Sequence, residues 1–573
     1  MKKILLPIVC FFIIALANAQ PPLFQWAKNI GGGSKIAVNR GNSITVDPFG
    51  NVYTTGYFGG TVDFDPSGAT YNLTSIGGYE NLFVSKLDPF GNFLWAKSMG
   101  GTSNVDGNSI ISDSMGNVYC TGYFQGTIDF DPDSGIANAV AIGSYDVFIL
   151  KIDPSGNFLW VKNIGGTSPE TAYSIAIDSS GNIYATGSFN GTSDFDPSSG
   201  TFNLTTVAGG QDIFILKLDS LGNFVWAKSM GGACVINGYS IVVDAIGSVY
   251  ATGYFCGTVD FDPNGGAVNL TSISMDVFIS KLDSSGNFLW AKNIGGAGSS
   301  NYGFSIALDE VGSVYTTGTF SATSDFNPNS GIVNLTPTDG KDVFILKLDD
   351  AGSFLWAKSI GGVLDDFGHS LSVDAFSNIY ITGSFRDIVD FDPGSATFNL
   401  ASTGNDAMFI SKLDSSGNFI WAKSMEGTSN VIGYSISVDI AGNVYSAGWF
   451  QGMADLDPSL STFNLTASAS GNIFIHKMSQ PPLGISENEN ITNIHIYPNP
   501  NSGVFNIATL SQINRGTIEI FNILGALVYT QAITNRKNTI ELNMDLVEGI
   551  YIYQVIVNDE LVQTDRLIII GHR

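Results

Sequence analysis

Histidine, the side chain used most often in acid–base catalysis, is rare in this sequence. The chain has four histidines, His369, His476, His495 and His572. They lie far apart in the sequence and match neither a serine-type triad nor the ligand spacing of a zinc site. No GxSxG, HExxH or phosphate-binding glycine motif is present either. We therefore predict no catalytic residue, and a protein that is not an enzyme is the favoured interpretation.

A unique binding site must break the symmetry of a repeated sequence, so polar residues outside the repeat pattern are the candidates. One loop contains three of them, and comparable loops of other repeats supply the rest. The candidate ligand-binding residues are Arg40, Glu170, Asn301, Asp365, Asp366 and His369. An enzyme would gather such residues on one face, which leaves an extracellular polysaccharide hydrolase or lyase as the alternative function.

Most acidic residues instead recur at fixed positions, as in the DxDP element Asp63-Phe64-Asp65-Pro66. Residues two apart on a strand share a face, so paired carboxylates of this element could ligate Ca²⁺. The residue between them is apolar in every copy, which strand packing alone explains. We favour the structural role and keep Ca²⁺ as the only cofactor to consider, with four candidate ligands, Asp63, Asp65, Asp129 and Asp131.

These residues are set in a repeat that is marked by tryptophan. It occurs at Trp26, Trp95, Trp160, Trp226, Trp290, Trp356 and Trp421, at steps of 69, 65, 66, 64, 66 and 65 residues. Each unit contains short segments rich in β-branched and aromatic residues, punctuated by Gly, Pro, Asp and Asn. Four such strands per unit, repeated seven times, predict an all-β fold, a seven-bladed β-propeller over residues 20–479.

The two ends of the repeat region indicate how the ring closes. The last unit stops at residues 472–478 and lacks the tryptophan strand that follows in the other six. An isolated copy of that strand, FQWAKNIGG, stands at residues 24–32. We predict that this N-terminal strand completes the seventh blade and so removes an exposed sheet edge.

The segment GGTSPETAYSIAIDSSGNIYATGSF at residues 165–189 resembles the bacterial seven-bladed propeller repeat known as the SBBP or β-propeller repeat. The resemblance extends over all seven units. It implies the propeller fold and says little about activity.

After a polar linker at 480–490, alternating apolar residues at Ile518, Ile520, Tyr551, Tyr553 and Val555 predict a small β-sandwich. Residues 491–573 resemble the type IX (Por) secretion C-terminal sorting domain through three motifs in order: YPNP at 497–500, NILG at 522–525 and GIY at 549–551. The resemblance implies the type IX secretion machinery as a partner.

The N-terminus has a basic start, an apolar run and the small-residue end Ala17-Asn18-Ala19, which predicts a cleavable signal peptide at 1–19. No later segment is apolar enough to span a membrane. A net charge of −26 argues against nucleic acid as a partner. The mature chain keeps Cys120, Cys234 and Cys256, which stand at different repeat positions, and we predict three unpaired, half-buried cysteines.

Together these features predict a monomeric binding or scaffold protein that crosses the periplasm and is secreted or displayed on the outer-membrane surface. Its ligand would be an extracellular glycan or protein. Tight Asp-x-x-Gly turns such as Asp88–Gly91 are predicted at one face of the ring. The longer loops then lie at the opposite face, where we expect the ligand to bind.

Overall fold

The structure is a computed structural model that describes residues 21–32, 38–468, 470–480, 494–497, 504–509, 516–522, 526–533, 539–543, 549–557 and 560–569. It divides the chain into two compact units, and the larger is Leu23–Ser479. The predicted signal peptide at 1–19 and residues 481–490 of the predicted linker lie outside the described residues. None of the described residues forms a helix long and apolar enough to cross a membrane.

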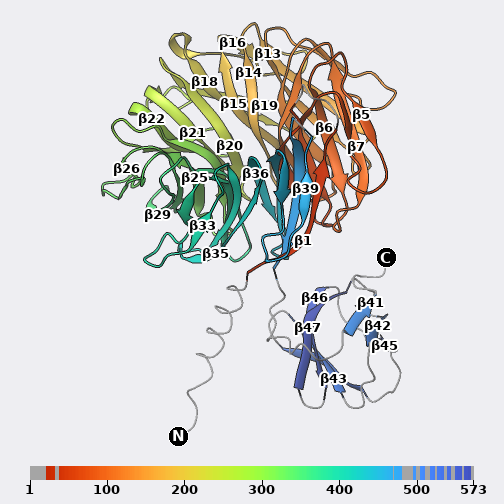
Figure 1. Ribbon diagram of the computed structural model, residues 1–573. Helices are drawn as coiled ribbons and strands as arrows, with labels where there is room; N and C mark the ends of the chain where they lie inside the picture. Colours follow the sequence, from red (N-terminus) through yellow and green to blue (C-terminus); the bar gives the residue numbers. More distant parts are fainter. Residues whose placement is uncertain are drawn as a thin grey trace. The chain divides into compact units, whose positions relative to one another are not determined.

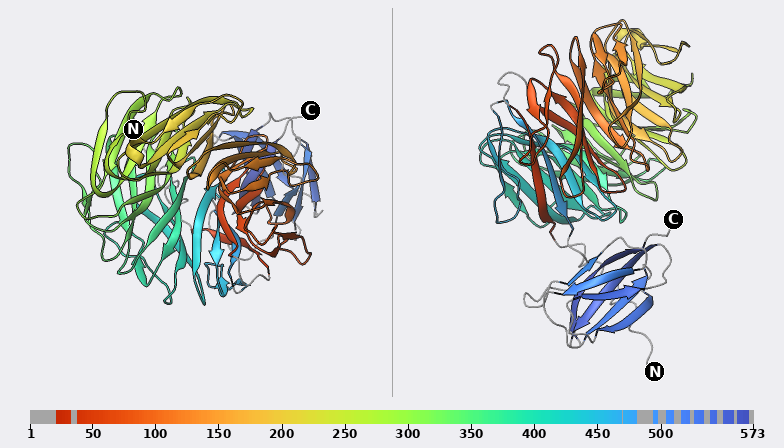
Figure 2. Two further views of the ribbon diagram at one scale, coloured as in Figure 1. Left: turned by 90° about the horizontal axis from the view of Figure 1, so that it is seen from above. Right: turned by 90° about the vertical axis from the view of Figure 1, so that its right-hand side faces the viewer.

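The larger unit is a β-propeller of seven four-stranded antiparallel blades arranged around a common axis (Figure 1, Figure 2). From the axis outward, the first three blades consist of β2 (Arg40–Val46), β3 (Val52–Phe58), β6 (Asn81–Leu87) and β7 (Phe93–Gly101); β8 (Val105–Ser112), β9 (Val118–Phe124), β12 (Asp146–Ile152) and β13 (Phe158–Gly166); and β14 (Glu170–Ile177), β15 (Ile183–Asn190), β18 (Gln211–Leu218) and β19 (Phe224–Gly232). The next three consist of β20 (Ile236–Val243), β21 (Val249–Asp260), β22 (Asn269–Leu282) and β23 (Phe288–Ile294); β24 (Tyr302–Leu308), β25 (Val314–Phe320), β28 (Asp342–Leu348) and β29 (Phe354–Ile360); and β30 (Phe367–Val373), β31 (Ile379–Phe385), β34 (Ala407–Leu413) and β35 (Phe419–Gly427). The seventh consists of β36 (Val431–Val438), β37 (Val444–Phe450), β40 (Asn472–Ser479) and β1 (Leu23–Ile30).

The N-terminal strand β1 completes the seventh blade, as predicted. It pairs antiparallel with β40, from Leu23 opposite Ser479 to Ile30 opposite Ile473. Figure 1 shows β1, at the red end of the colour scale, beside the blue strands of the last blade. The indole Nε1 of Trp26 donates to the Pro89 carbonyl oxygen of blade 1 at 3.3 Å, so β1 also joins the last blade to the first.

A second closed ring lies next to the axis. In every innermost strand a serine hydroxyl accepts a hydrogen bond from a backbone N–H of the next blade, at 3.2–3.3 Å. The series runs from Ser43, which binds Ile110 N–H, to Ser435, which binds Ile44 N–H. This ring explains why serine recurs in every SIxVD segment.

The DxDP element begins a hairpin that is inserted between the second and third strands of each blade. Six copies form separate short strands: β4 (Thr61–Asp63) with β5 (Asn72–Thr74), β10 (Thr127–Asp129) with β11 (Asn138–Val140), β16 (Thr192–Asp194) with β17 (Asn203–Thr205), β26 (Ser324–Asp325) with β27 (Asn334–Leu335), β32 (Ile388–Asp390) with β33 (Asn399–Ala401), and β38 (Met453–Asp455) with β39 (Asn464–Thr466). In blade 4 the hairpin extends β21 and β22, and a 3₁₀ turn (Val207–Gly209) follows the hairpin of blade 3. Each hairpin also pairs with the outer strand of the preceding blade. The insertions therefore fasten neighbouring blades to each other.

The second glycine of the Gly-Gly pair that follows six tryptophan strands, and Gly427 of Glu426-Gly427 in the remaining one, permit this contact. A Cβ at Gly32 would lie 2.1 Å from the Thr61 carbonyl oxygen, so only glycine allows the hairpin to approach. The short turns also match the prediction: Asp88 Oδ1 accepts hydrogen bonds from the N–H groups of Phe90 and Asn92, both at 2.8 Å.

The smaller unit contains two antiparallel sheets. One consists of β41 (Ile494–Tyr497), β42 (Val504–Thr509) and β45 (Thr539–Asn543), and the other of β43 (Gly516–Asn522), β44 (Leu527–Ile533), β46 (Gly549–Val557) and β47 (Glu560–Ile569). The alternating apolar residues of β43 and β46 are buried, as the period of two predicted.

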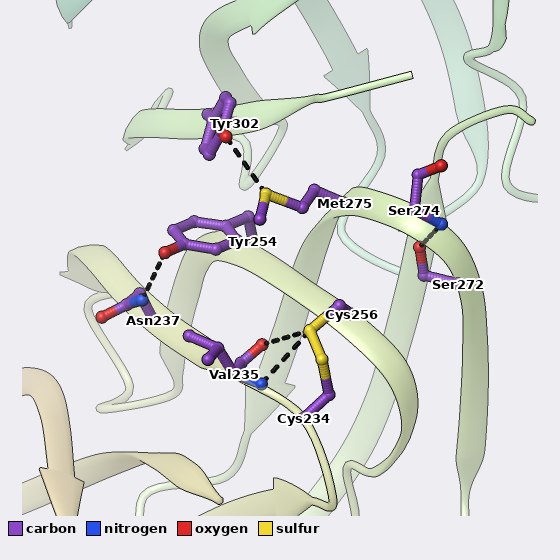
Figure 3. The surroundings of a disulfide bond; sticks show 9 residues. All are labelled: Cys234, Val235, Asn237, Tyr254, Cys256, Ser272, Ser274, Met275 and Tyr302. Carbon is purple, nitrogen blue, oxygen red and sulfur yellow. Dashed lines mark hydrogen bonds between the residues drawn. A yellow bond between two sulfur atoms is a disulfide. The ribbon is translucent and has the colours of Figure 1, made fainter. Parts of the chain in front are cut away.

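The prediction of three unpaired cysteines was wrong, because Cys234 and Cys256 form a disulfide (Figure 3). Comparing repeat positions across blades missed a partner within the same blade. Ile236 pairs with Phe255, which places Cys256 beside the segment that precedes Ile236, and the Cα atoms of Cys234 and Cys256 are 5.6 Å apart. Cys120 is the free cysteine of the described residues; burial raises its pKa to about 12, so the thiol is unreactive.

Candidate functional site

Each innermost strand contains a β-bulge near its start. The pairing register shifts once in all seven, directly after the residue at the Gly41 position, so one residue per blade is extra. These extra residues are Asn42, Asn108, Tyr173, Tyr239, Phe304, His369 and Tyr434. A bulge turns a side chain out of the regular alternation, and here all seven side chains line one cavity around the axis.

The cavity has a volume of about 340 Å³. Four more residues line the cavity. They form two cross-strand pairs, Arg40 with Tyr57 in blade 1 and Asp106 with Tyr123 in blade 2. All of these residues lie at the strand ends next to the loops that follow the Gly-Gly pairs. The cavity is thus at the long-loop end of the channel, opposite the short Asp-x-x-Gly turns.

The lining of the cavity is asymmetric although the fold is repeated. Blades 1 and 2 supply the amides Asn42 and Asn108, the charged Arg40 and Asp106, and the two tyrosines that pair with them. Blades 3 to 7 supply one bulge side chain each, and all five are rings. The cavity therefore has a polar side and an aromatic side.

The aromatic side is a continuous arc of rings from neighbouring blades. The centroids of Tyr173 and Tyr239 are 5.1 Å apart, and those of Tyr239 and Phe304 are 5.7 Å apart. His369 follows at 5.9 Å from Phe304 and 5.5 Å from Tyr434. Burial, with a smaller contribution from Arg40, lowers the pKa of His369 to about 4. The imidazole is therefore neutral at neutral pH.

Arg40 lies where the arc meets the polar side. Its guanidinium carbon is 3.8 Å from the centroid of the Tyr434 ring, a cation–π contact. Its Nε is buried and has no hydrogen-bond partner among the described residues.

Asp106 is the acidic group of the cavity and is only 7% exposed. Its Oδ2 accepts a hydrogen bond from the Tyr123 hydroxyl, whereas its Oδ1 has no partner in the part of the chain that the structure describes. Burial raises the pKa of Asp106, and the Tyr123 hydrogen bond and the charge of Arg40 oppose that rise. Burial and the charge of Asp106 in turn raise the pKa of nearby Glu80.

The structure brings Arg40 and His369 of the predicted site together at the cavity. Glu170, Asn301 and Asp366 each lie one residue before the position that Arg40 occupies in blade 1. Because side chains alternate along a strand, these three point into the blades. There Glu170 Oε2 accepts from Gly166 N–H at 3.1 Å, Asn301 Nδ2 donates to a serine hydroxyl at 3.0 Å, and Asp366 Oδ2 accepts from Gly362 N–H at 2.8 Å. The exposed Asp365 accepts from Lys341 N–H at 3.0 Å.

Asp106, Tyr57 and Tyr123 were not among the predicted residues, nor were the bulge residues other than His369. A signal for the bulge residues exists in the sequence, since each directly precedes the repeated serine. The bulge itself, which decides where they point, cannot be seen in that pattern.

Two of the candidate Ca²⁺ ligands, Asp63 and Asp129, accept hydrogen bonds from backbone N–H groups. Asp63 Oδ1 accepts from the N–H groups of Asp65 at 3.1 Å and Tyr71 at 2.8 Å, and Asp129 Oδ1 accepts from Asp131 and Ala137 in the same way. Among the described residues, no group of three or more His, Cys, Asp or Glu side chains is arranged to hold a metal ion.

The disulfide links the segment before β20 to β21 in blade 4 (Figure 3). Next to it, Asn237 Nδ2 donates to the Tyr254 hydroxyl at 2.7 Å, and the Tyr254 ring lies 5.6 Å from that of Tyr239.

Comparison with known proteins gives relatives that match in part. A viral protein of Acanthamoeba polyphaga mimivirus, "Uncharacterized WD repeat-containing protein L264", is 26% identical over 74% of this chain and 36% of its own length. "Ulvan lyase NLR42" of Nonlabens ulvanivorans is 38% identical over 14% of this chain and 15% of its own length. The chain thus spans about a third or less of these curated relatives. Among solved structures, a fungal alcohol oxidase in complex with copper covers 80% of this chain and 96% of its own, at 10% identity and a TM-score of 0.27.

Two family models match the chain itself. The model of the beta-propeller repeat, SBBP, matches residues 25–57, 159–196 and 355–384. The model of the secretion system C-terminal sorting domain, Por, matches residues 495–570. The chain is therefore a protein of SBBP β-propeller repeats that ends in a Por secretion system C-terminal sorting domain.

Proposed function

We propose that this chain is a secreted or cell-surface binding protein and that the cavity on the propeller axis is its ligand site. The observation that carries the proposal is the broken symmetry of the cavity. Seven equivalent bulge positions carry two amides on one side and five rings on the other, next to Arg40 and Asp106. A purely structural channel needs no such division, whereas ligand sites combine apolar walls with a few placed polar groups.

The sorting domain supports a function outside the cell. A Por C-terminal sorting domain implies handling by the type IX secretion system and secretion or surface attachment. The end of the propeller at which the chain enters and leaves also suits a tethered protein. Leu23 and Ser479 pair at the short-turn end, so the chain enters and leaves the propeller there. The cavity opens at the other end, away from both connections.

A polysaccharide hydrolase or lyase is the second candidate. Asp106, bonded to the Tyr123 hydroxyl, and the nearby Arg40 could act as an acid–base group and a charge-stabilising group. The partial match to a protein named as an ulvan lyase is compatible with this function. Against it, the cavity lining holds a single carboxylate, and glycoside hydrolysis usually requires two.

The test is a binding screen of the mature, full-length chain against glycan and peptide arrays. We expect at least one ligand whose binding is lost in Tyr239→Ala and kept in Asp365→Asn, an exposed rim variant. Retention of all binding in Tyr239→Ala would refute the cavity as the site. Assays of glycan cleavage on the same hits decide the second candidate, since turnover that is lost in Asp106→Asn would establish an enzyme.

A further inference from the structure

We infer that the cavity recognises a neutral pyranose, a sugar ring without carboxylate or sulfate groups. This inference rests on the proposed function, because it names the ligand class of the same site. It is carried by three features of the lining: the aromatic arc, an unpartnered buried donor with an unpartnered buried acceptor, and the balance of charge.

The aromatic arc provides a curved apolar wall of tilted rings, against which one face of a sugar ring can pack. Successive centroids of Tyr173, Tyr239, Phe304, His369 and Tyr434 are 5.1, 5.7, 5.9 and 5.5 Å apart, so the five rings form one uninterrupted wall. The faces of aromatic rings carry partial negative charge and attract the weakly positive C–H groups of a pyranose. A cavity of about 340 Å³ suits one or two such rings, and it is at the lower end of the roughly 300–1,000 Å³ range of ligand pockets.

Beside this wall, Arg40 Nε offers a donor and Asp106 Oδ1 offers an acceptor, and neither has a partner among the described residues. A buried polar group without a partner destabilises the protein, so a ligand that satisfies both groups gains affinity from each. A hydroxyl group donates one hydrogen bond and accepts others. Adjacent sugar hydroxyls therefore match this pair, whereas a carboxylate can only accept.

The charge of the cavity selects against an acidic sugar. The guanidinium of Arg40 already faces the Tyr434 ring and is close enough to Asp106 to oppose the rise of its pKa. Glu80 is a second acid near Asp106, and the chain as a whole carries a net charge of −26. Arg40 is the one cation of the described lining, and a carboxylate or sulfate that approached it would also approach Asp106. Repulsion between like charges then disfavours it.

The experiment is isothermal titration calorimetry of the mature, full-length chain with two sets of probes. The neutral set contains gluco-, xylo-, manno- and galacto-oligosaccharides, and the acidic set contains oligoalginate, oligogalacturonate and sulfated galactan fragments. We expect a neutral oligosaccharide to bind with a Kd that changes less than twofold between 0.05 and 0.5 M NaCl, because screening acts only on charge–charge attraction.

Variants decide where the sugar binds. Asp106→Ala and Tyr239→Leu should each weaken binding at least tenfold, and Asp365→Asn should leave Kd within twofold. Thermal unfolding of each variant confirms that it is folded, and Tyr239→Phe, which keeps the ring, should retain most of the affinity.

The outcomes separate the two proposals. Binding of acidic probes alone, weakened by salt and lost in the cavity variants, would overturn the neutral-sugar inference and leave the cavity as the ligand site. Neutral-sugar binding that survives both cavity substitutions would overturn this inference, and it would also show that the cavity is not the ligand site of the proposed function. No binding of any probe in either set would overturn this inference alone.

Discussion

Trp26 links the closing strand β1 to blade 1, and its removal gives a measurable prediction. Trp26 is 9% exposed, donates a hydrogen bond to the Pro89 carbonyl of blade 1 and lies 6.5 Å, ring to ring, from Tyr445 of blade 7. Trp26→Ala removes this contact between the first and last blades. Tryptophan-to-alanine changes at buried sites cost about 3–5 kcal/mol, and the area that such a ring buries gives a similar upper bound of about 4–6 kcal/mol.

The assay is equilibrium unfolding in guanidinium chloride, monitored by circular dichroism. We expect the free energy of unfolding of Trp26→Ala to fall by about 3–5 kcal/mol. The matched control is Gln25→Ala, one residue earlier and exposed, for which we expect a change within about 0.5 kcal/mol. Equal stabilities of the two variants would refute the argument that β1 locks the ring.

Three further predictions concern the disulfide, a buried carboxyl and export. Replacing Cys234 and Cys256 by serine opens a loop whose ends are 22 residues apart and should lower the free energy of unfolding by about 3 kcal/mol. The same titration measures this loss, with the wild type under reducing conditions as the comparison. An unchanged free energy of unfolding in both would contradict a stabilising disulfide. Burial raises the pKa of Glu170 to about 7, so the native state holds a proton that the unfolded state has lost above about pH 4.5, and wild-type stability should fall as pH rises from there to about 7. Glu170→Gln lacks this titration and should gain about 1–3 kcal/mol relative to wild type between pH 4 and pH 8; a constant difference would show that the carboxyl titrates normally. Deleting residues 491–573 should leave a folded propeller in the periplasm, which immunoblots of cell fractions detect, and efficient release of the truncated chain to the medium would show that the domain is not its export signal.

The fold followed from the sequence because its determinants recur in six or all seven of the units. These determinants are the glycine pairs, the DxDP elements and the turn aspartates. They act locally, through close approach or hydrogen bonds to nearby backbone N–H groups, so the sequence of one unit is enough to predict their roles. The orphan tryptophan strand likewise implied its partner, since the last unit lacked that one strand.

The candidate site was only partly predictable because it depends on where side chains point. Arg40 and Glu170 stand in neighbouring positions of equivalent strands, yet one faces the channel and the other the blade. The bulge after Gly41 and its equivalents moves the next residue toward the axis, and no residue type in the sequence indicates that a bulge forms there. The Cys234–Cys256 bond was missed for a related reason, since it depends on the cross-strand register within one blade.

The most direct test of the central claim is a crystal structure of the mature chain with the oligosaccharide that binds most tightly. The account predicts one sugar ring in the axial cavity, with a hydroxyl within hydrogen-bond distance of Asp106 Oδ1 and one face against the arc that contains Tyr239. An oligosaccharide bound at the short-turn face or on the outer strands, with no sugar in the cavity, would contradict it.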